Sequence, residues 1–154
     1  MAVHGVSRST ADLDLLTLAR ECLDPQMWEP LRASAIDVQV RQGGIDDPLA
    51  GVVRFAHAAE HPVDLVVGKS RWQDAIIAGA RLAQIEDARV PVASAPGLIL
   101  LKLYAGGPQD AWDVVQLLSG PDPAALIAEV EAAIDALPAG CRELWGRVRT
   151  TQIG

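Results

Sequence analysis

The residues best suited to chemistry in this chain are aspartates in segments that otherwise resemble β-strands. Asp12 and Asp14 lie in the alternating segment 12–17, and Asp64 lies in the apolar segment 62–67. Aspartate is depleted in strands because its short polar side chain favours turns and helix caps. Side chains repeat every two residues along a strand, so Asp12 and Asp14 share one face, with Cα atoms about 6.6–7 Å apart.

A carboxylate on a buried strand needs a partner. Without one, Asp64 would cost several kcal/mol, so it should lie beside a cation or be protonated. Neighbouring strands lie about 4.8 Å apart, so Asp64 could reach Asp12 and Asp14 if the two strands adjoin. Three convergent carboxylates suit one or two Mg²⁺ ions, and two such ions can clamp an in-line phosphoryl displacement. The alternative is two solvated carboxylates at a strand start and an ion-paired Asp64.

The elements that position these carboxylates follow from the apolar pattern. Strands are predicted over 12–17, 36–41, 51–55, 62–67 and 88–93. Helices are predicted over about 25–33, over 70–81 behind a Ser70–Gln73 capping box, after Ser94, from Pro108 to Gly120, from Pro123 to near Pro138, and over about 139–148. We expect one domain over 1–154 of the α/β (α+β) class, with a β-rich core over about 1–93 and a helical part over about 94–149. Its mixed sheet would be flanked by helices, and the C-terminal helices would pack on that sheet.

Composition narrows the classes of partner. Lys and Arg number 13 against 20 Asp and Glu, a net charge of −7, so a broad nucleic-acid-binding face is not expected. The longest apolar run, 97–106, is interrupted by Lys102 and is too short to cross a membrane. The first residues lack the pattern of a signal peptide, so a cytoplasmic protein with no membrane association is expected. Cys22 and Cys141 lie far apart and are interpreted as buried small hydrophobic residues.

A second chemical motif is interpreted as a coincidence. His57, Glu60 and His61 spell H-x-x-E-H, the pattern of inverted zinc peptidases. That chemistry needs a helix that turns both histidines toward one metal. Here the segment lies between two predicted strands and Pro62 follows at once, so we expect a turn.

The ordered acidic and basic residues resemble a known family, the nucleotidyltransferase superfamily with its polymerase-beta-like fold. The closest likeness is to small toxin–antitoxin-associated and uncharacterised bacterial members. Residues 5–16 are similar to the Asp-x-Asp segment of that family, residues 46–54 and 63–65 to the stretch leading to its third carboxylate, and residues 93–117 to the helical segment that follows. The resemblance covers roughly 3–118. The residues that carry it are Arg8, Asp12, Asp14, Asp64, Lys102, Asp110 and Asp113.

The resemblance implies a mechanism for the three carboxylates. Asp12 and Asp14 would bind Mg²⁺ and the phosphates of a nucleoside triphosphate. Asp64 would be the third metal ligand and could activate the attacking hydroxyl of the acceptor. The expected function is therefore metal-dependent transfer of a nucleotidyl group to an unknown acceptor, with a protein or small molecule favoured over nucleic acid.

Basic residues would bind the nucleotide. The resemblance assigns Arg8 and Lys102 to the triphosphate, and Lys69 and Arg71 are further candidates beside a helix N-terminus, which favours anions. Each of these side chains could instead be an ordinary surface charge. Asp110 and Asp113 share a helix face, where they could fix Lys102 by ion pairing or favour the helix dipole.

One departure from the family pattern leads to a second hypothesis. Family members carry a Gly-Gly or Gly-Ser pair ahead of the Asp-x-Asp strand, and here that pair would fall at or before Met1. If the pair is lost, we expect a catalytically degenerate protein that binds a nucleotide or a partner, such as the other half of a toxin–antitoxin pair. A homo-oligomer is also compatible with the apolar faces of the last two predicted helices.

Overall fold

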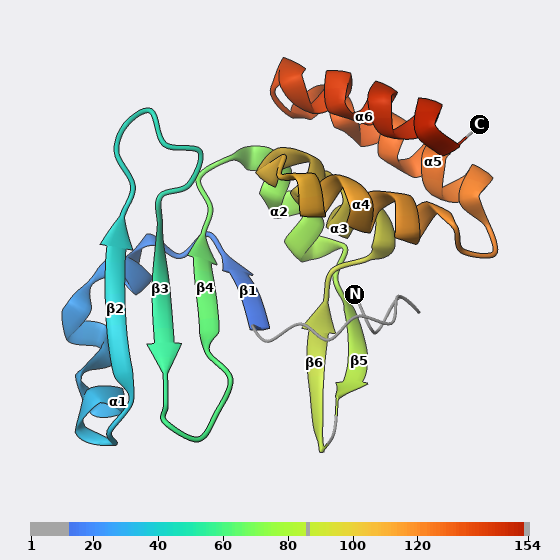
Figure 1. Ribbon diagram of the computed structural model, residues 1–154. Helices are drawn as coiled ribbons and strands as arrows, with labels where there is room; N and C mark the ends of the chain where they lie inside the picture. The colour runs from blue at the N-terminus through green and yellow to red at the C-terminus, as the bar shows by residue number, and fades with distance from the viewer. Residues whose placement is uncertain (1–12, 86, 153–154) are drawn as a thin grey trace. The chain divides into compact units, whose positions relative to one another are not determined.

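The computed structural model describes residues 13–85 and 87–152, and these divide into two compact units, one up to Ile77 and one from Ala78 onward. Figure 1 shows the elements of both units. Each unit has its own hydrophobic core and is described by itself below. The organisation of 1–154 as a single domain stays a prediction.

The first unit contains a mixed four-stranded sheet in the order β1-β4-β3-β2. Its elements are β1 (Leu13–Thr17), η2 (Arg20–Leu23), η3 (Pro25–Trp28), α1 (Glu29–Ala33), β2 (Asp37–Gln42), β3 (Gly51–Ala56), β4 (Val63–Val67) and α2 (Arg71–Ala78). Strand β1 runs parallel to β4, whereas β3 is antiparallel to both of its neighbours. The predicted class, a mixed α/β protein, is confirmed at this level.

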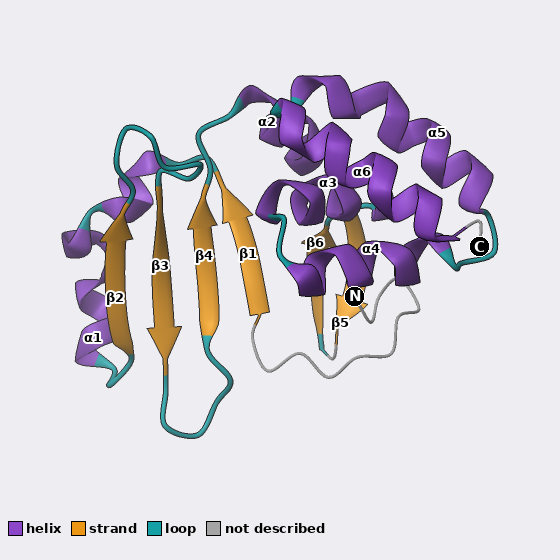
Figure 2. Ribbon diagram, turned by 45° about the horizontal axis from the view of Figure 1, so that its top comes forward, coloured by secondary structure: helices purple, strands orange, loops and turns teal. Residues whose placement is uncertain are grey.

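One face of the sheet is covered by the helical turns between β1 and β2. Alternation along the strands sends Val38, Val53 and Leu65 to this face, where they join the buried core that also contains Cys22 and Leu23. Figure 2 shows η2, η3 and α1 gathered near β2. The polar residues of the same strands therefore lie on the opposite face.

The covering segment is held by local capping and by an aromatic contact. The Asp24 carboxylate accepts a hydrogen bond from the Gln26 backbone N–H at 2.9 Å, ahead of a proline at the first helical position. The indole of Trp28 donates to the Cys22 carbonyl at 2.8 Å and packs edge-on against Phe55. The helix predicted over 25–33 is thus present as η3 followed by α1.

The second unit combines a hairpin with a group of helices. Its elements are β5 (Arg81–Ile85), β6 (Ala88–Val92), α3 (Ala95–Ala105), α4 (Pro108–Leu118), α5 (Pro123–Ala133), η4 (Ile134–Ala136) and α6 (Ala139–Gln152). The helix predicted over 70–81 ends at Ala78, and the strand β5 that follows was not predicted. Strands β5 and β6 form an antiparallel pair.

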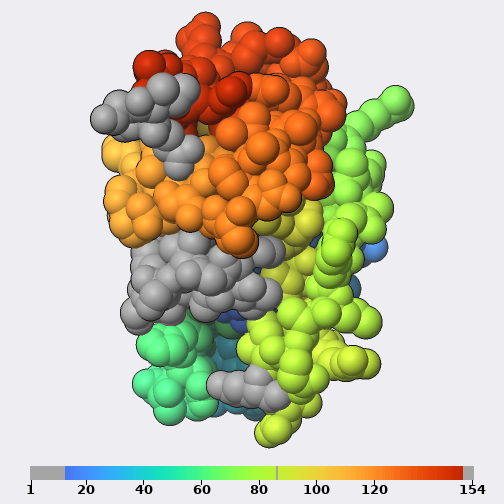
Figure 3. Space-filling model, turned by 90° about the vertical axis from the view of Figure 1, so that its right-hand side faces the viewer, coloured from blue at the N-terminus to red at the C-terminus, as the bar shows by residue number. Residues whose placement is uncertain are grey.

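The helices of the second unit enclose a common core. Helix α3 contacts α4, α5 and α6, and the buried side chains include Ile99, Leu103, Val114 and Val130. Figure 3 shows α4, α5 and α6, coloured orange to red, packed together. Ser94 caps α3 by accepting a hydrogen bond from the Gly97 backbone N–H, as its sequence predicts. Among the described residues, no helix combines the length and the apolar character needed to cross a membrane.

Candidate functional site

The centre of the candidate site is a pair of aspartates on neighbouring parallel strands. Asp14 on β1 is in register with Asp64 on β4, so both side chains leave the sheet on the same face. The strand spacing places their Cα atoms about 4.8 Å apart. The predicted proximity of Asp14 and Asp64 is therefore confirmed, whereas their role as metal ligands stays a prediction. Asp12 and Arg8, the other predicted site residues of this segment, lie outside the described residues.

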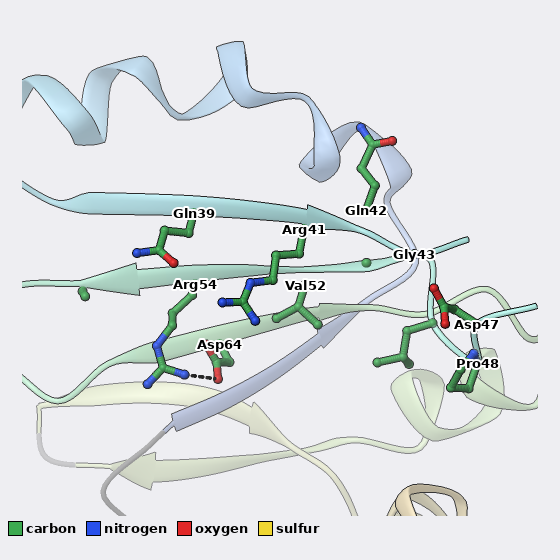
Figure 4. Close-up of a pocket in the computed structure, with 12 residues that line it drawn as sticks. Gln39, Arg41, Gln42, Gly43, Asp47, Pro48, Val52, Arg54 and Asp64 are labelled. Atoms are coloured by element: carbon green, nitrogen blue, oxygen red, sulfur yellow. Dashed lines mark hydrogen bonds and ion pairs between the residues drawn. The ribbon is translucent and has the colours of Figure 1, made fainter. Parts of the chain in front are cut away.

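A row of polar side chains continues from this pair across the sheet. Asp64 is in register with Arg54 on β3, and Arg54 is in register with Gln39 on β2. The Arg54 Nη1 atom donates to Asp64 Oδ2 at 3.0 Å, which forms an ion pair (Figure 4). The row Asp14–Asp64–Arg54–Gln39 spans all four strands on the face that the helical turns leave uncovered.

The second carboxylate oxygen of Asp64 is the unusual atom of the site. Asp64 Oδ1 is buried and has no hydrogen-bond partner among the described residues, although the side chain as a whole is 20% exposed. A buried acceptor without a partner carries a desolvation cost of about 1–3 kcal/mol. A cation held beside this oxygen would remove that cost.

The described part of the chain brings two of the predicted carboxylates together, those of Asp14 and Asp64. No group of three His, Cys, Asp or Glu side chains in the described part of the chain has the arrangement of a metal site. The third predicted carboxylate, Asp12, is two residues before Asp14 in the sequence. A site with three acidic ligands therefore depends on Asp12, and the described geometry supplies two of them.

A groove of about 530 Å³ begins at Asp64 and runs over the uncovered face of the sheet. Its lining includes Gln39 and Arg41 from β2, Val52 and Arg54 from β3, and the turn residues that follow β2. Figure 4 shows Gln39, Arg41 and Arg54 extending from neighbouring strands into this groove. The groove thus contains two guanidinium groups together with the carboxylate of Asp64.

Lys69 lies beyond the opposite end of β4 from Asp64. Lys69 is five positions after Asp64, which corresponds to about 16 Å of extended chain. The Lys69 ammonium donates to the Ile45 carbonyl at 2.9 Å, and its backbone N–H donates to Gln73 Oε1 at 3.0 Å. Together with Arg20 and Arg71, Lys69 lines a small pocket of about 140 Å³. The structure does not bring Lys69 to the carboxylate pair, and its role toward a nucleotide stays a prediction.

Lys102 lies on α3 in the second unit, where two carboxylates neutralise it. Its ammonium pairs with Asp113 Oδ2 at 2.7 Å and with Asp110 Oδ1 at 3.0 Å, and Asp113 is fully buried. Burial alone would lower the pKa of Lys102, but hydrogen bonds and charge from Asp113 and Asp110 outweigh it and raise the pKa. Asp110 and Asp113 were expected either to fix Lys102 by ion pairing or to favour the helix dipole, and the ion pairing is present. Asp110 also accepts from the Gly107 backbone N–H at the start of α4.

The H-x-x-E-H segment forms a connection between strands. Residues 57–62 join β3 to β4 without a helix, and the Glu60 backbone N–H donates to the His57 carbonyl at 3.2 Å. The prediction of a turn is confirmed. The helical geometry that would turn two histidines toward one zinc ion is not present in this segment.

Arg54 and Arg41 are candidate site residues that the sequence pattern alone did not predict. Both are charged residues within β-strands, the same feature that singled out Asp14 and Asp64 as candidate site residues. The antiparallel register of β2, β3 and β4 identifies them. It pairs Arg54 with Asp64, and it places Arg41 two residues along β2 from Gln39, the partner of Arg54.

Comparisons with known proteins add no further assignment. No protein-family model matches the chain, and no curated protein matches it at a significant level. The interpretation of the site therefore depends on the residues described above and on their geometry.

Proposed function

We propose that this chain is a metal-dependent nucleotidyltransferase that uses Asp14 and Asp64 as its central carboxylates. One observation carries the proposal: the two aspartates are in register on the sheet face opposite the helical turns, and one buried oxygen of Asp64 has no hydrogen-bond partner among the described residues. This buried oxygen carries a desolvation cost that a cation or a substrate beside it would remove.

The donor set fits a hard divalent cation. Mg²⁺ prefers carboxylate oxygens and usually keeps several waters, so one or two protein carboxylates together with substrate phosphates suffice to hold it. Asp14 and Asp64 would hold the ion, and Asp12, two residues before Asp14 in the sequence, is the proposed third ligand. When bound, the ion would neutralise phosphate charge and orient the triphosphate.

The proposed reaction is an in-line displacement at the α-phosphorus of a nucleoside triphosphate. The acceptor hydroxyl oxygen forms a bond to the α-phosphorus, and the bond from that phosphorus to the oxygen bridging to the β-phosphate breaks, which releases pyrophosphate. The hydroxyl proton passes to the Asp64 carboxylate and then to water. Arg54 orients this carboxylate through Oδ2. Arg8 remains a proposed cation for the triphosphate.

Release of pyrophosphate tests the proposal. The full chain is incubated with each of the four nucleoside triphosphates and MgCl₂, together with separate fractions of protein, small molecules and RNA as acceptors. We expect release that requires both the protein and magnesium and that is supported by one of the acceptor fractions. Nucleotide binding without pyrophosphate release would favour the degenerate binding module, and the absence of both would contradict the proposal.

A further inference from the structure

We propose that the groove beside Asp64 binds a phosphate group of a substrate, with the Arg41 guanidinium as its principal ligand. Which substrate carries this phosphate depends on the proposed function. The binding site itself is defined by β2 and β3 and can be tested without magnesium or nucleotide.

The placement of Arg41 follows from the register of the sheet. Gln39 pairs with Arg54, and Arg41 is two residues further along β2, so it occupies the diagonal position with a Cα separation of about 7–8 Å from Arg54. Arg41 and Arg54 leave the sheet on the same face. Figure 4 shows the Arg41 side chain extending toward Arg54 and Asp64. Two guanidinium groups therefore lie on the same side of the carboxylate pair.

The two arginines differ in whether an anionic side chain pairs with their guanidinium. Arg54 is paired with Asp64 at 3.0 Å, whereas the described structure contains no hydrogen bond or ion pair to the Arg41 guanidinium. A planar guanidinium matches a phosphate through two parallel hydrogen bonds, and such charge-assisted bonds are among the strongest in proteins. A phosphate beside Arg41 would provide the missing counter-charge and would also contact Arg54.

The groove has the dimensions and lining that such a group requires. Its volume of about 530 Å³ exceeds the need of one phosphate and leaves room for the rest of a substrate. Val52 and Ala56 contribute apolar lining, and Gln39 adds an amide that can donate or accept. Ligand sites commonly combine an apolar lining with a few placed polar groups in this way.

The other group of cations is a weaker candidate for the same chemistry. Arg20, Lys69 and Arg71 share a pocket of about 140 Å³ that also contains Asp74. The Lys69 ammonium is already bonded to the Ile45 carbonyl. The groove beside Asp64 therefore offers the larger space and lies next to the proposed central carboxylates.

A titration of the full chain with inorganic phosphate, without magnesium, tests the site. Nuclear magnetic resonance of the arginine Nε–H groups follows each guanidinium separately. We expect the signals of Arg41 and Arg54 to shift, and we expect Arg41→Gln to weaken phosphate binding about tenfold or more. The matched control is Arg89→Gln, which removes the same charge from an exposed residue of β6 and should leave binding unchanged.

Titration of the same variants with Mg²⁺ and ATP identifies the source of the phosphate. Weaker ATP binding in Arg41→Gln assigns the phosphate to the donor, and unchanged ATP binding with weakened phosphate binding assigns it to the acceptor. Equal phosphate affinity in Arg41→Gln and Arg89→Gln, or shifts at Arg20 and Arg71 in place of Arg41, would show an adventitious ion only and overturn the proposal. Phosphate binding at Arg41 in a protein that shows no magnesium-dependent transfer would leave the groove intact and remove the proposed function alone.

Discussion

Substitution of Asp14 with asparagine is expected to lower magnesium-dependent nucleotidyl transfer by about a hundredfold or more. The amide has the shape of the carboxylate but lacks its charge, and loss of even a supporting group around a metal costs about 10–100-fold in affinity or activity. Asparagine keeps one acceptor oxygen at the same position, and far-ultraviolet circular dichroism of the variant checks that the folded state is retained. The measurements are the initial rate of pyrophosphate release and the affinity for Mn²⁺ as a paramagnetic substitute for Mg²⁺.

The matched control for this variant is Asp37→Asn. Asp37 is an exposed aspartate of the same sheet, on β2, where it accepts a hydrogen bond from the Gln39 side chain at 2.8 Å. An asparagine oxygen can accept the same bond, so transfer and Mn²⁺ binding should stay at the wild-type level. Transfer by Asp14→Asn at the wild-type rate would dismiss the carboxylate pair as the metal site.

Replacement of Lys102 with methionine is expected to lower the free energy of unfolding of the second, helical unit (from Ala78 onward) by about 3–5 kcal/mol. The substitution leaves Asp113 without its ammonium partner at a fully buried position, and loss of one member of a buried pair has effects of this size. Urea unfolding followed by far-ultraviolet circular dichroism measures the change, because most helical residues belong to this unit.

Two further variants separate the buried charge from other effects of the substitution. Asp110→Asn removes the partly exposed partner and should cost about 1 kcal/mol or less, since Asp113 still neutralises Lys102. The double variant Lys102→Met/Asp113→Leu removes both charges and should recover most of the stability. A loss in Lys102→Met no greater than that in Asp110→Asn would contradict the interpretation.

The dependence of stability on pH provides an independent check of the same ion pairs. The pKa of Lys102 is raised in the folded protein above its ordinary value of 10.5. A raised pKa means that the stabilisation is complete below pH 10.5 and is lost as the pH rises through the folded-state value. The wild-type protein should therefore lose this contribution in strongly alkaline solution, and Lys102→Met should lack the corresponding step.

The sequence predicted those features that depend on local pattern. Alternation located β1, and the apolar segment around Asp64 located β4. Strand spacing predicts that Asp64 reaches Asp14 if the two strands are neighbours, and the register of Asp14 with Asp64 agrees. Caps such as Asp24 and Ser94 were also predictable, because a capping side chain bonds to a backbone group two or three residues away.

The remaining features depend on pairings between distant segments. The contact of Arg54 with Asp64 follows from the register of β3 and β4, which no local pattern encodes. Strand β5 was missed because the preceding helix pattern continues past Ala78 and most side chains of β5 are exposed, so no buried face marks the strand. Lys102 was assigned to a triphosphate by resemblance, whereas its contacts are to Asp110 and Asp113.

The two cysteines provide each compact unit with its own chemical reporter. Cys22 lies in the core of the sheet unit and Cys141 in the core of the helical unit. Burial raises the pKa of both thiols, so neither forms the reactive thiolate readily in the folded state. A thiol-specific reagent should modify each cysteine only when its own unit opens, so the two labelling rates, read by mass spectrometry, would show whether the halves of the chain unfold together or separately.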